Sequence, residues 1–225
     1  MTDSCYKLAA FDLGGTLLVT KSSNWYITAP VMDFLQKTTC TDEEVASSII
    51  HAKKAVKTEV LAKNIKDEQR IYLQFYRSFF HYLHLSVPVS ESMLIEFSIS
   101  RTLTAEQFEL NWPAIYAIEA LSKHTGTALF SNTWPSVIAF LRSEGVLDAF
   151  SHTYFSCNVG VKKPDPKMFE LLLADTNCKA EEVILYDDNA RVIETAMKYG
   201  LCSRQITFDT LLATMKKDFP EDKLC

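Results

Sequence analysis

The chain has 225 residues, 48% of them hydrophobic, which is enough to bury one sizeable core or a core and a smaller lid. Its formal net charge is -5, with 28 acidic residues against 23 basic residues that are dispersed along the chain, so we expect no nucleic acid partner. No run approaches the roughly 20 apolar residues that cross a membrane, so we expect no membrane partner. The first twenty residues lack an export signal and the six cysteines are scattered, so we expect a cytoplasmic protein with reduced thiols.

A short buried strand opens the chain. The apolar run from Tyr6 leads into FDLGGTLL, which places Asp12 at the end of a strand and Gly14, Gly15 and Thr16 in the turn that follows. Glycines allow the backbone N–H groups of such a turn to come close to an anion. Asp12 and its glycine turn are therefore a candidate binding site.

Residues 19–110 are expected to be wholly helical. Thr41 and Glu44 form a capping-box signature ahead of apolar residues at helical spacing from Val45 to Val60. A second helix, residues 67–85, is crowded with aromatic side chains. Aromatic residues at this spacing usually face a core, so we interpret them as helix–helix packing and not as a ligand site.

After residue 111 short apolar runs alternate with helices. Such alternation predicts βαβ units and a parallel sheet that is buried on both faces. The expected fold is α/β, a Rossmann-like parallel sheet core of residues 1–18 and 111–225, with an inserted all-helical cap at residues 19–110. The expected strands after the insertion are 127–132, 153–156, 183–188 and 204–208. Helices are expected to begin near Asn111, Thr133 and Asp165. A further helix is expected to end at Gly200, and a last helix follows the final strand.

Polar residues follow the expected strands at the points where the strands end. Ligands of such sheets bind beyond the carboxyl ends of the strands, so these groups are expected to meet in one cleft. Carboxylates brought together need a cation, and Mg²⁺ prefers carboxylate and phosphate oxygens. A lysine and a hydroxyl beside them would hold an anion. The residues concerned are Asp12, Ser131, Asn132, Lys163, Asp187 and Asp188.

Each of these residues also has a plain structural interpretation. Asp12 can cap a turn, Ser131 and Asn132 can precede a helix, and Asp187 with Asp188 can form a turn after a strand. Taken singly, short matches are weak. Their common order, each after an apolar strand, favours a phosphoryl site beside a metal.

The sequence resembles the haloacid dehalogenase (HAD) superfamily, which is mostly phosphatases with a nucleophilic aspartate. FDLGGTL resembles its first motif, hhhDxDGT, and ALFSN its second, an apolar strand that ends in Ser or Thr. GVKKPDPKMFELLL resembles the lysine loop, and VILYDDNARVIETAMKYGL resembles the acidic fourth motif. Residues 19–110 resemble the cap that some members carry between the first two motifs.

The resemblance implies roles for individual residues. Asp12 would be the nucleophile, and Ser131 and Lys163 would hold the transferring phosphoryl group. Asp187 and Asp188 would bind Mg²⁺. The resemblance also implies that the turn and the residue after Ser131 contact the substrate, through Gly14, Gly15, Thr16 and Asn132. Asp12 and the backbone carbonyl of Gly14 would be further Mg²⁺ ligands. Thr16 would also brace the loop.

Two positions depart from the family pattern. The residue two after the nucleophile is usually an Asp that protonates the leaving oxygen, and here it is Gly14. Where the family often has Asn four residues after Asp188, this chain has Val192. General acid–base catalysis is worth about 10²–10⁴-fold, so we expect a slow or selective enzyme.

The leading prediction is a Mg²⁺-dependent phosphomonoesterase acting on a small phosphorylated metabolite. The alternative from another class is a non-catalytic relative that binds a phospho-ligand. A phosphonate-cleaving hydrolase would need a cap lysine as a Schiff base, and a dehalogenase would have an aromatic residue in place of Gly14. The cap lysines are Lys53, Lys54, Lys57 and Lys63, and Trp25 and Tyr26 are candidates for substrate selection.

Overall fold

The computed structural model describes residues 6–22, 24–56, 61–83, 85, 87–103 and 107–224. Its chain forms two compact units. One, here the core unit, contains Met1–Val19, Glu109–Thr133 and Leu141–Cys225; the other, here the helical unit, contains Thr20–Phe108 and Trp134–Phe140. Within the described residues, no helix combines the length and the apolar character that crossing a membrane requires.

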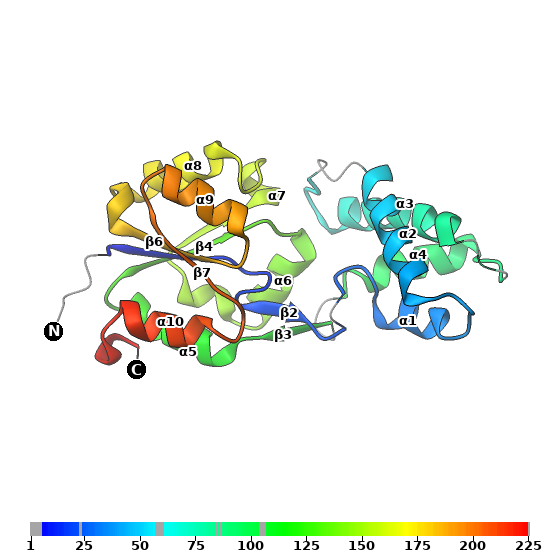
Figure 1. Cartoon of the computed structure of the whole chain (residues 1–225), viewed down its shortest axis with the longest axis horizontal. Helices are drawn as coiled ribbons and strands as arrows, with labels where there is room; N and C mark the ends of the chain where they lie inside the picture. Colours follow the sequence, from blue (N-terminus) through cyan, green and yellow to red (C-terminus); the bar gives the residue numbers. More distant parts are fainter. Residues whose placement is uncertain are drawn as a thin grey trace. The chain divides into compact units, whose positions relative to one another are not determined.

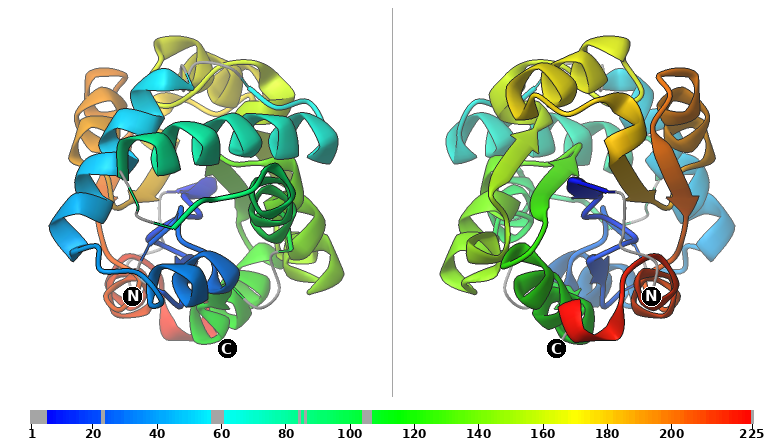
Figure 2. Two further views of the ribbon diagram at one scale, coloured as in Figure 1. Left: turned by 90° about the vertical axis from the view of Figure 1, so that its right-hand side faces the viewer. Right: turned by 90° about the vertical axis from the view of Figure 1, so that its left-hand side faces the viewer.

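The core unit is built on a five-stranded parallel sheet with the order β5-β4-β1-β6-β7 (Figure 1). Helices α8 and α9 lie on one face of this sheet and α5 and α10 on the other (Figures 1 and 2). The α/β, Rossmann-like expectation is therefore confirmed. The strands are β1 Leu8–Phe11, β4 Gly126–Ser131, β5 His152–Phe155, β6 Val183–Asp187 and β7 Cys202–Gln205.

Helices α5 and α8 of the core unit begin where the sequence signals predict, whereas the short helix α7 was not predicted. Asn111 caps α5, its side chain accepting a hydrogen bond from the Ala114 N–H at 3.3 Å, and Asp165 caps α8 through the Lys167 N–H at 2.9 Å. The helices are α5 Trp112–Ser122, α7 Ser156–Val159, α8 Pro166–Thr176, α9 Ala190–Lys198 and α10 Leu211–Asp218, with short 3₁₀ turns at Val146–Ala149, Ala180–Glu182 and Glu221–Lys223. Helix α6 Pro135–Ser143 begins in the helical unit and ends in the core unit.

The helical unit is held together by aromatic side chains. The capping box of Thr41 and Glu44 is present, with the Thr41 N–H donating to Glu44 Oε2 at 2.7 Å. The aromatic residues of α3 face the inside of this unit, as predicted, except Tyr82, which is exposed. Val60, counted in the sequence pattern, lies outside the described residues. The helices are α1 Ala29–Leu35, α2 Asp42–Ala55, α3 Ile65–Leu83 and α4 Glu91–Ser100.

Three expectations need correction. Residues 19–110 are not wholly helical, because the segment begins and ends in two short strands, β2 Leu18–Thr20 and β3 Phe108–Leu110, that pair with each other. The last strand is β7 Cys202–Gln205 and not 204–208, because its pairing with β6 runs from Cys202 opposite Ile184 to Gln205 opposite Asp187, where β6 ends. The long helix begins at Ile65, two residues before the expected start, because Asn64 receives the Asp67 N–H at 3.0 Å.

Candidate active site

Asp12, Lys163 and Asp187 meet at the carboxyl ends of neighbouring strands. Asp12 follows β1, and its N–H donates to the Tyr186 carbonyl of β6 at 2.8 Å, so it stands level with Asp187. The ammonium of Lys163 lies 2.5 Å from Asp12 Oδ1 and 2.6 Å from Asp187 Oδ2. All three side chains are buried. Residues 151 positions apart in the chain therefore form one charged triad.

The charges of the triad support one another. Burial works against the charged form of Lys163, but the carboxylates of Asp12 and Asp187 prevail and raise its pKa above the usual lysine value. Burial raises the pKa of Asp187 to about 6, with the charge of Asp12 adding to the rise and Lys163 opposing it. The Asn189 N–H also donates to Asp187 Oδ1 at 2.9 Å. The triad is thus a cation shared by two carboxylates, one of which gains a proton readily.

Asp188 completes a group of three carboxylates. One oxygen each from Asp12, Asp187 and Asp188 lies within 4.8 Å of the others. Opposite ligands on one Mg²⁺ ion lie about 4 Å apart, and the ion takes hard oxygen donors, so the spacing and the donor chemistry fit Mg²⁺. Burial, followed by the charge of Asp12, raises the pKa of Asp188. A bound cation would relieve this repulsion.

The glycine turn leaves room for Asp188. Gly15 has φ +80°, and a Cβ on it would lie 2.3 Å from Asp188 Oδ2. Its N–H donates to the Leu18 carbonyl at 2.8 Å within the loop, and its contact with a substrate stays a prediction. Gly14 lies in the same turn and forms a bridge with Leu18. Gly15 is therefore required for space and backbone conformation.

Backbone hydrogen bonds hold this loop. The carbonyl of Leu13 accepts hydrogen bonds from the N–H groups of Thr16, Leu17 and Leu18 at 3.2, 2.8 and 2.8 Å. Thr16 is fully buried, and its hydroxyl has no hydrogen-bond partner within the described part of the chain. Its substrate contact and bracing role stay predictions.

Ser131 and Asn132 stand where β4 ends. Ser131 is buried and pairs with Phe155 of β5, which fixes it at the edge of the sheet where Asp12 lies. Asn132 is exposed, but both polar atoms of its side chain bond to the main chain of Lys163. Sequence reasoning placed Asn132 beside the substrate and missed this link.

Sequence reasoning also missed Asn189, although a signal was available. Its N–H holds Asp187, and its side chain caps α9 by accepting the Arg191 N–H at 3.0 Å. An Asn that directly follows an acidic pair and precedes a helix is a common N-cap pattern. Val192, the second departure from the family pattern, packs in the hydrophobic core of this unit and offers no polar group to the acidic cluster.

The helical unit carries separate candidate residues. The Lys53 ammonium lies 4.4 Å from the centre of the Tyr26 ring, whereas Lys54 and Lys63 are exposed. Lys57 lies outside the described residues. Tyr26 in turn stacks on Phe75 at 4.9 Å. Among the cap lysines that the structure describes, only Lys53 is fixed against an aromatic ring.

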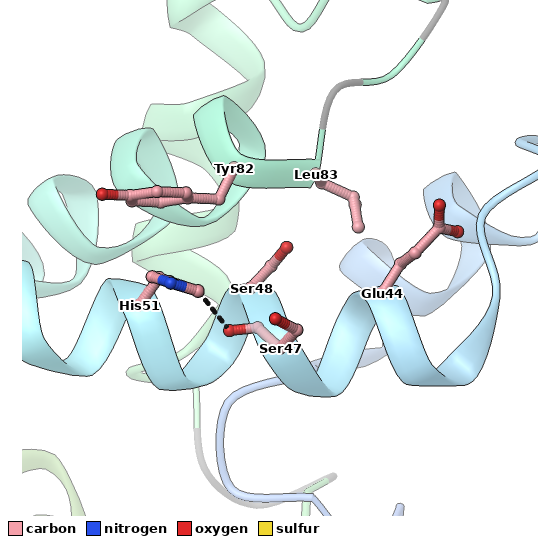
Figure 3. Close-up of a pocket in the computed structure, with 6 residues that line it drawn as sticks. All are labelled: Glu44, Ser47, Ser48, His51, Tyr82 and Leu83. Atoms are coloured by element: carbon pink, nitrogen blue, oxygen red, sulfur yellow. Dashed lines mark hydrogen bonds between the residues drawn. The ribbon is translucent and has the colours of Figure 1, made fainter.

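A small polar pocket lies between α2 and α3 of the helical unit (Figure 3). His51 Nδ1 lies 2.9 Å from the Ser47 carbonyl, and the His51 ring stacks on Tyr82 at 4.4 Å. Glu44 is used by the capping box. The pocket contains none of the carboxylates Asp12, Asp187 and Asp188, and the hydrogen bonds of Glu44 and His51 are local contacts within or at the start of α2. It is lined by Glu44, Ser47, Ser48, His51, Tyr82 and Leu83.

Comparison with known proteins identifies the family. The family model described as haloacid dehalogenase-like hydrolase matches residues 6–200. The chain therefore belongs to the haloacid dehalogenase-like hydrolases. The bifunctional epoxide hydrolase 2 of Sus scrofa is 24% identical over 138 residues, which are 58% of this chain and 24% of that protein. This chain thus spans about a quarter of the length of that relative.

Solved structures share the fold. A haloacid dehalogenase-like family hydrolase from Xanthomonas campestris is 14% identical with a TM-score of 0.68, covering 97% of this chain and 94% of that chain. A HAD family enzyme from Bacteroides thetaiotaomicron, in complex with magnesium and inorganic phosphate, is 17% identical with a TM-score of 0.53, covering 90% and 95%. The L-2-haloacid dehalogenase of Xanthobacter autotrophicus is 16% identical with a TM-score of 0.58, covering 94% and 82%. At these identities the likenesses show the fold alone.

Proposed function

We propose that this protein is a Mg²⁺-dependent phosphomonoesterase that uses Asp12 as its nucleophile on a small phosphorylated metabolite. The observation that carries the proposal is the ammonium of Lys163 held between Asp12 and Asp187, with Asp188 beside them. Within the family, one solved neighbour is a complex with magnesium and inorganic phosphate, which supports this chemistry for the fold.

The proposed reaction has two displacements. A carboxylate oxygen of Asp12 attacks phosphorus, the bond from phosphorus to the leaving oxygen breaks, and the leaving oxygen takes a proton from water. Water then attacks the phosphorus of the aspartyl phosphate, which releases inorganic phosphate and returns the Asp12 carboxylate. Lys163 and the Ser131 hydroxyl hold the phosphoryl oxygens throughout.

The metal would be held by the acidic cluster. Asp12, Asp187, Asp188 and the carbonyl of Gly14 are the proposed ligands. When bound there, Mg²⁺ supplies positive charge that offsets the charge of the phosphoryl oxygens. Asp188 is more exposed than Asp187, whose two oxygens already receive Lys163 and the Asn189 N–H, so Asp188 is the better placed direct ligand.

The helical unit is proposed to act as a cap. Its first segment, Thr20–Phe108, is inserted directly after the turn that carries Asp12. A lid that closes over a cleft excludes water and leaves room only for small substrates. The described cysteines Cys40, Cys178 and Cys202 are free thiols, which supports the proposed cytoplasmic location.

The test is phosphate release from an activated aryl phosphate and a panel of metabolites, with Mg²⁺ or with a chelator. Wild-type protein should release phosphate only with Mg²⁺, and the Asp12→Asn variant should fall to the level of the blank. A beryllium fluoride adduct that forms on wild-type protein and not on Asp12→Asn would identify the nucleophile. Absence of turnover and of the adduct would overturn the proposal.

Gly14 favours a second candidate, a relative that binds a phospho-ligand without turnover. No side chain at this position can protonate the leaving oxygen. The variant Gly14→Asp decides between the two candidates. General acid–base catalysis supplies about 10²–10⁴-fold in rate. Restoring the acid should therefore raise the rate at least tenfold in an enzyme that lacks only this group. Tight binding of phosphate esters with no turnover in either protein would support the binder.

A phosphonate-cleaving reaction is less well supported. It would need a neutral lysine amine to form a Schiff base with the substrate. The amine of Lys53 instead lies over the face of the Tyr26 ring, an arrangement that attracts a cation. Borohydride trapping with a phosphonate substrate checks this point, and we expect no adduct on Lys53.

A further inference from the structure

The main chain of Lys163 is held by one side chain. The Lys163 N–H donates to Asn132 Oδ1 at 2.7 Å, and Asn132 Nδ2 donates to the Lys163 carbonyl at 2.8 Å. These two bonds form a ring between a side-chain amide and a main-chain amide. The ring joins the residue after β4 to the loop between α7 and α8.

The position of this main chain controls the position of the ammonium. Lys163 has a long side chain with four rotatable bonds, yet its nitrogen lies within 2.6 Å of two carboxylate oxygens and 5.3 Å from the centre of the Phe130 ring. Such short contacts require the backbone at the other end of the side chain to be fixed. A misplacement of 1 Å in a catalytic group can cost about 10²-fold in rate.

Asn132 also links the backbone segments that carry the two proposed phosphoryl-binding residues, Ser131 and Lys163. It directly follows Ser131, which is anchored in β4 by its pairing with Phe155. Through Asn132, the loop that carries Lys163 is tied to the end of the same strand. One residue therefore ties the main chain of Lys163 to the strand end that carries Ser131.

We propose that Asn132 is a positioning residue for Lys163, acting through the Lys163 main chain and not through direct contact with the substrate. Each polar atom of its side chain already has a partner in Lys163. The catalytic meaning of this inference rests on the proposed phosphatase function. The link itself can be tested without activity.

The first measurement is the chemical reactivity of the Lys163 amine. Trace acetylation followed by mass spectrometry reports each lysine, with exposed Lys123 as the internal reference. Asn132→Ala should raise the acetylation of Lys163 relative to Lys123 at least tenfold, because the ammonium is released from its carboxylates. Asn132→Asp keeps an acceptor for the Lys163 N–H but loses the donor, and it should give a smaller rise.

Asn111→Ala is the matched control. Asn111 also uses both polar atoms of its side-chain amide on the main chain, because it accepts the nearby Ala114 N–H and donates to the distant Phe208 carbonyl at 2.6 Å. It is more buried than Asn132, so its loss should cost at least as much stability. It touches no residue of the triad, and it should leave the reactivity of Lys163 unchanged.

The second measurement is turnover. Asn132→Ala should lower kcat by about 10–100-fold, with a smaller change in KM, while Asn111→Ala lowers neither. An unchanged Lys163 reactivity with a raised KM would overturn the proposal in favour of direct substrate contact. Equal effects of Asn132→Ala and Asn111→Ala on reactivity would also overturn it. If wild-type protein has no turnover but the reactivities differ, the positioning role stands and the phosphatase function fails.

Discussion

Among the described residues, each unit buries one cationic side chain, and the two are held in different ways. Lys163 of the core unit bonds to the carboxylates of Asp12 and Asp187. Arg101 of the helical unit is 1% exposed and donates Nε–H to the Trp25 carbonyl at 2.9 Å. Its guanidinium lies 4.8 Å from the centre of the Tyr72 ring, and within the described residues its Nη1 has no hydrogen-bond partner.

The difference separates Lys163, the proposed phosphoryl-binding group, from Arg101, which holds a loop. A buried ammonium between two carboxylates keeps opposite charges together at a strand end, where an anion can exchange with them. A buried guanidinium on a carbonyl and two rings fixes a loop, here the segment that follows β2. The charged partners of a buried cation, more than its burial, mark the candidate active site.

Removing each cation tests this contrast, and the largest effect is expected at Lys163. Lys163→Met leaves two carboxylates buried side by side, and it should lower the free energy of unfolding by about 3–5 kcal/mol at pH 7. Arg101→Met leaves the Trp25 carbonyl without its donor and removes a positive charge that acts on Glu68, and we expect a loss of about 1–3 kcal/mol. Urea denaturation of both variants and the wild type measures these losses.

The pH dependence gives a control for Lys163→Met. Without the ammonium, the carboxylates of Asp12 and Asp187 repel each other. Protonation as the pH falls removes this repulsion and so stabilises the folded state of the variant. Its deficit against the wild type should therefore shrink between pH 7 and pH 4, whereas the deficit of Arg101→Met should change less. A larger loss for Arg101→Met at pH 7 would break the contrast.

A smaller loss of stability is expected when alanine replaces Gly15 or Gly145, two glycines that share a backbone conformation but have different neighbours. Gly15 has φ +80° and Gly145 φ +73°, so an alanine at either position should cost about 1–2 kcal/mol. A Cβ on Gly15 meets Asp188, whereas one on Gly145 meets nothing within 4 Å. Gly15→Ala should additionally weaken Mg²⁺ binding, measured by calorimetry, and Gly145→Ala should not. Equal Mg²⁺ affinities would show that Asp188 moves aside freely.

The core unit was largely predictable from sequence because its signals are local. A strand pattern, a glycine turn and N-cap residues such as Asn111 and Asp165 each act within a few residues. Once the sheet is parallel, residues that follow its strands must gather at one edge. Asp12, Lys163 and Asp187 could therefore be grouped although they lie far apart in the chain.

The remaining features depend on contacts that no local pattern encodes. The pairing of β2 with β3 joins segments about 90 residues apart, and the bonds from Asn132 to Lys163 cross 31 positions. Arg101 and Glu68 look like surface residues of amphipathic helices, yet both are fully buried. Their burial follows from tertiary packing, which periodicity within one helix does not report.

The smallest effect is expected at Glu68, the buried carboxylate of the helical unit. Its two oxygens accept the N–H of Ser136 at 2.9 Å and the Ser136 hydroxyl at 2.7 Å. A glutamine can keep both bonds, because a hydroxyl also accepts, and it removes the cost of a buried charge. Glu68→Gln should therefore change the free energy of unfolding by no more than about 1 kcal/mol at pH 7.

The pH dependence of this variant shows whether Glu68 acts as an ion-pair partner of Arg101. Burial raises the pKa of Glu68 and outweighs the hydrogen bonds of Ser136 and the charge of Arg101, which lower it. The folded state therefore binds the proton more tightly than the unfolded chain, in which the pKa of a glutamate is about 4.3. The stability from this protonation is present below pH 4.3 and is lost as the pH rises through the folded pKa. Wild-type stability should consequently fall relative to Glu68→Gln as the pH rises from 4 to 7 in urea titrations. A rise instead would mean that the charge of Arg101 outweighs burial, and that the helical unit too keeps a paired charge in its core.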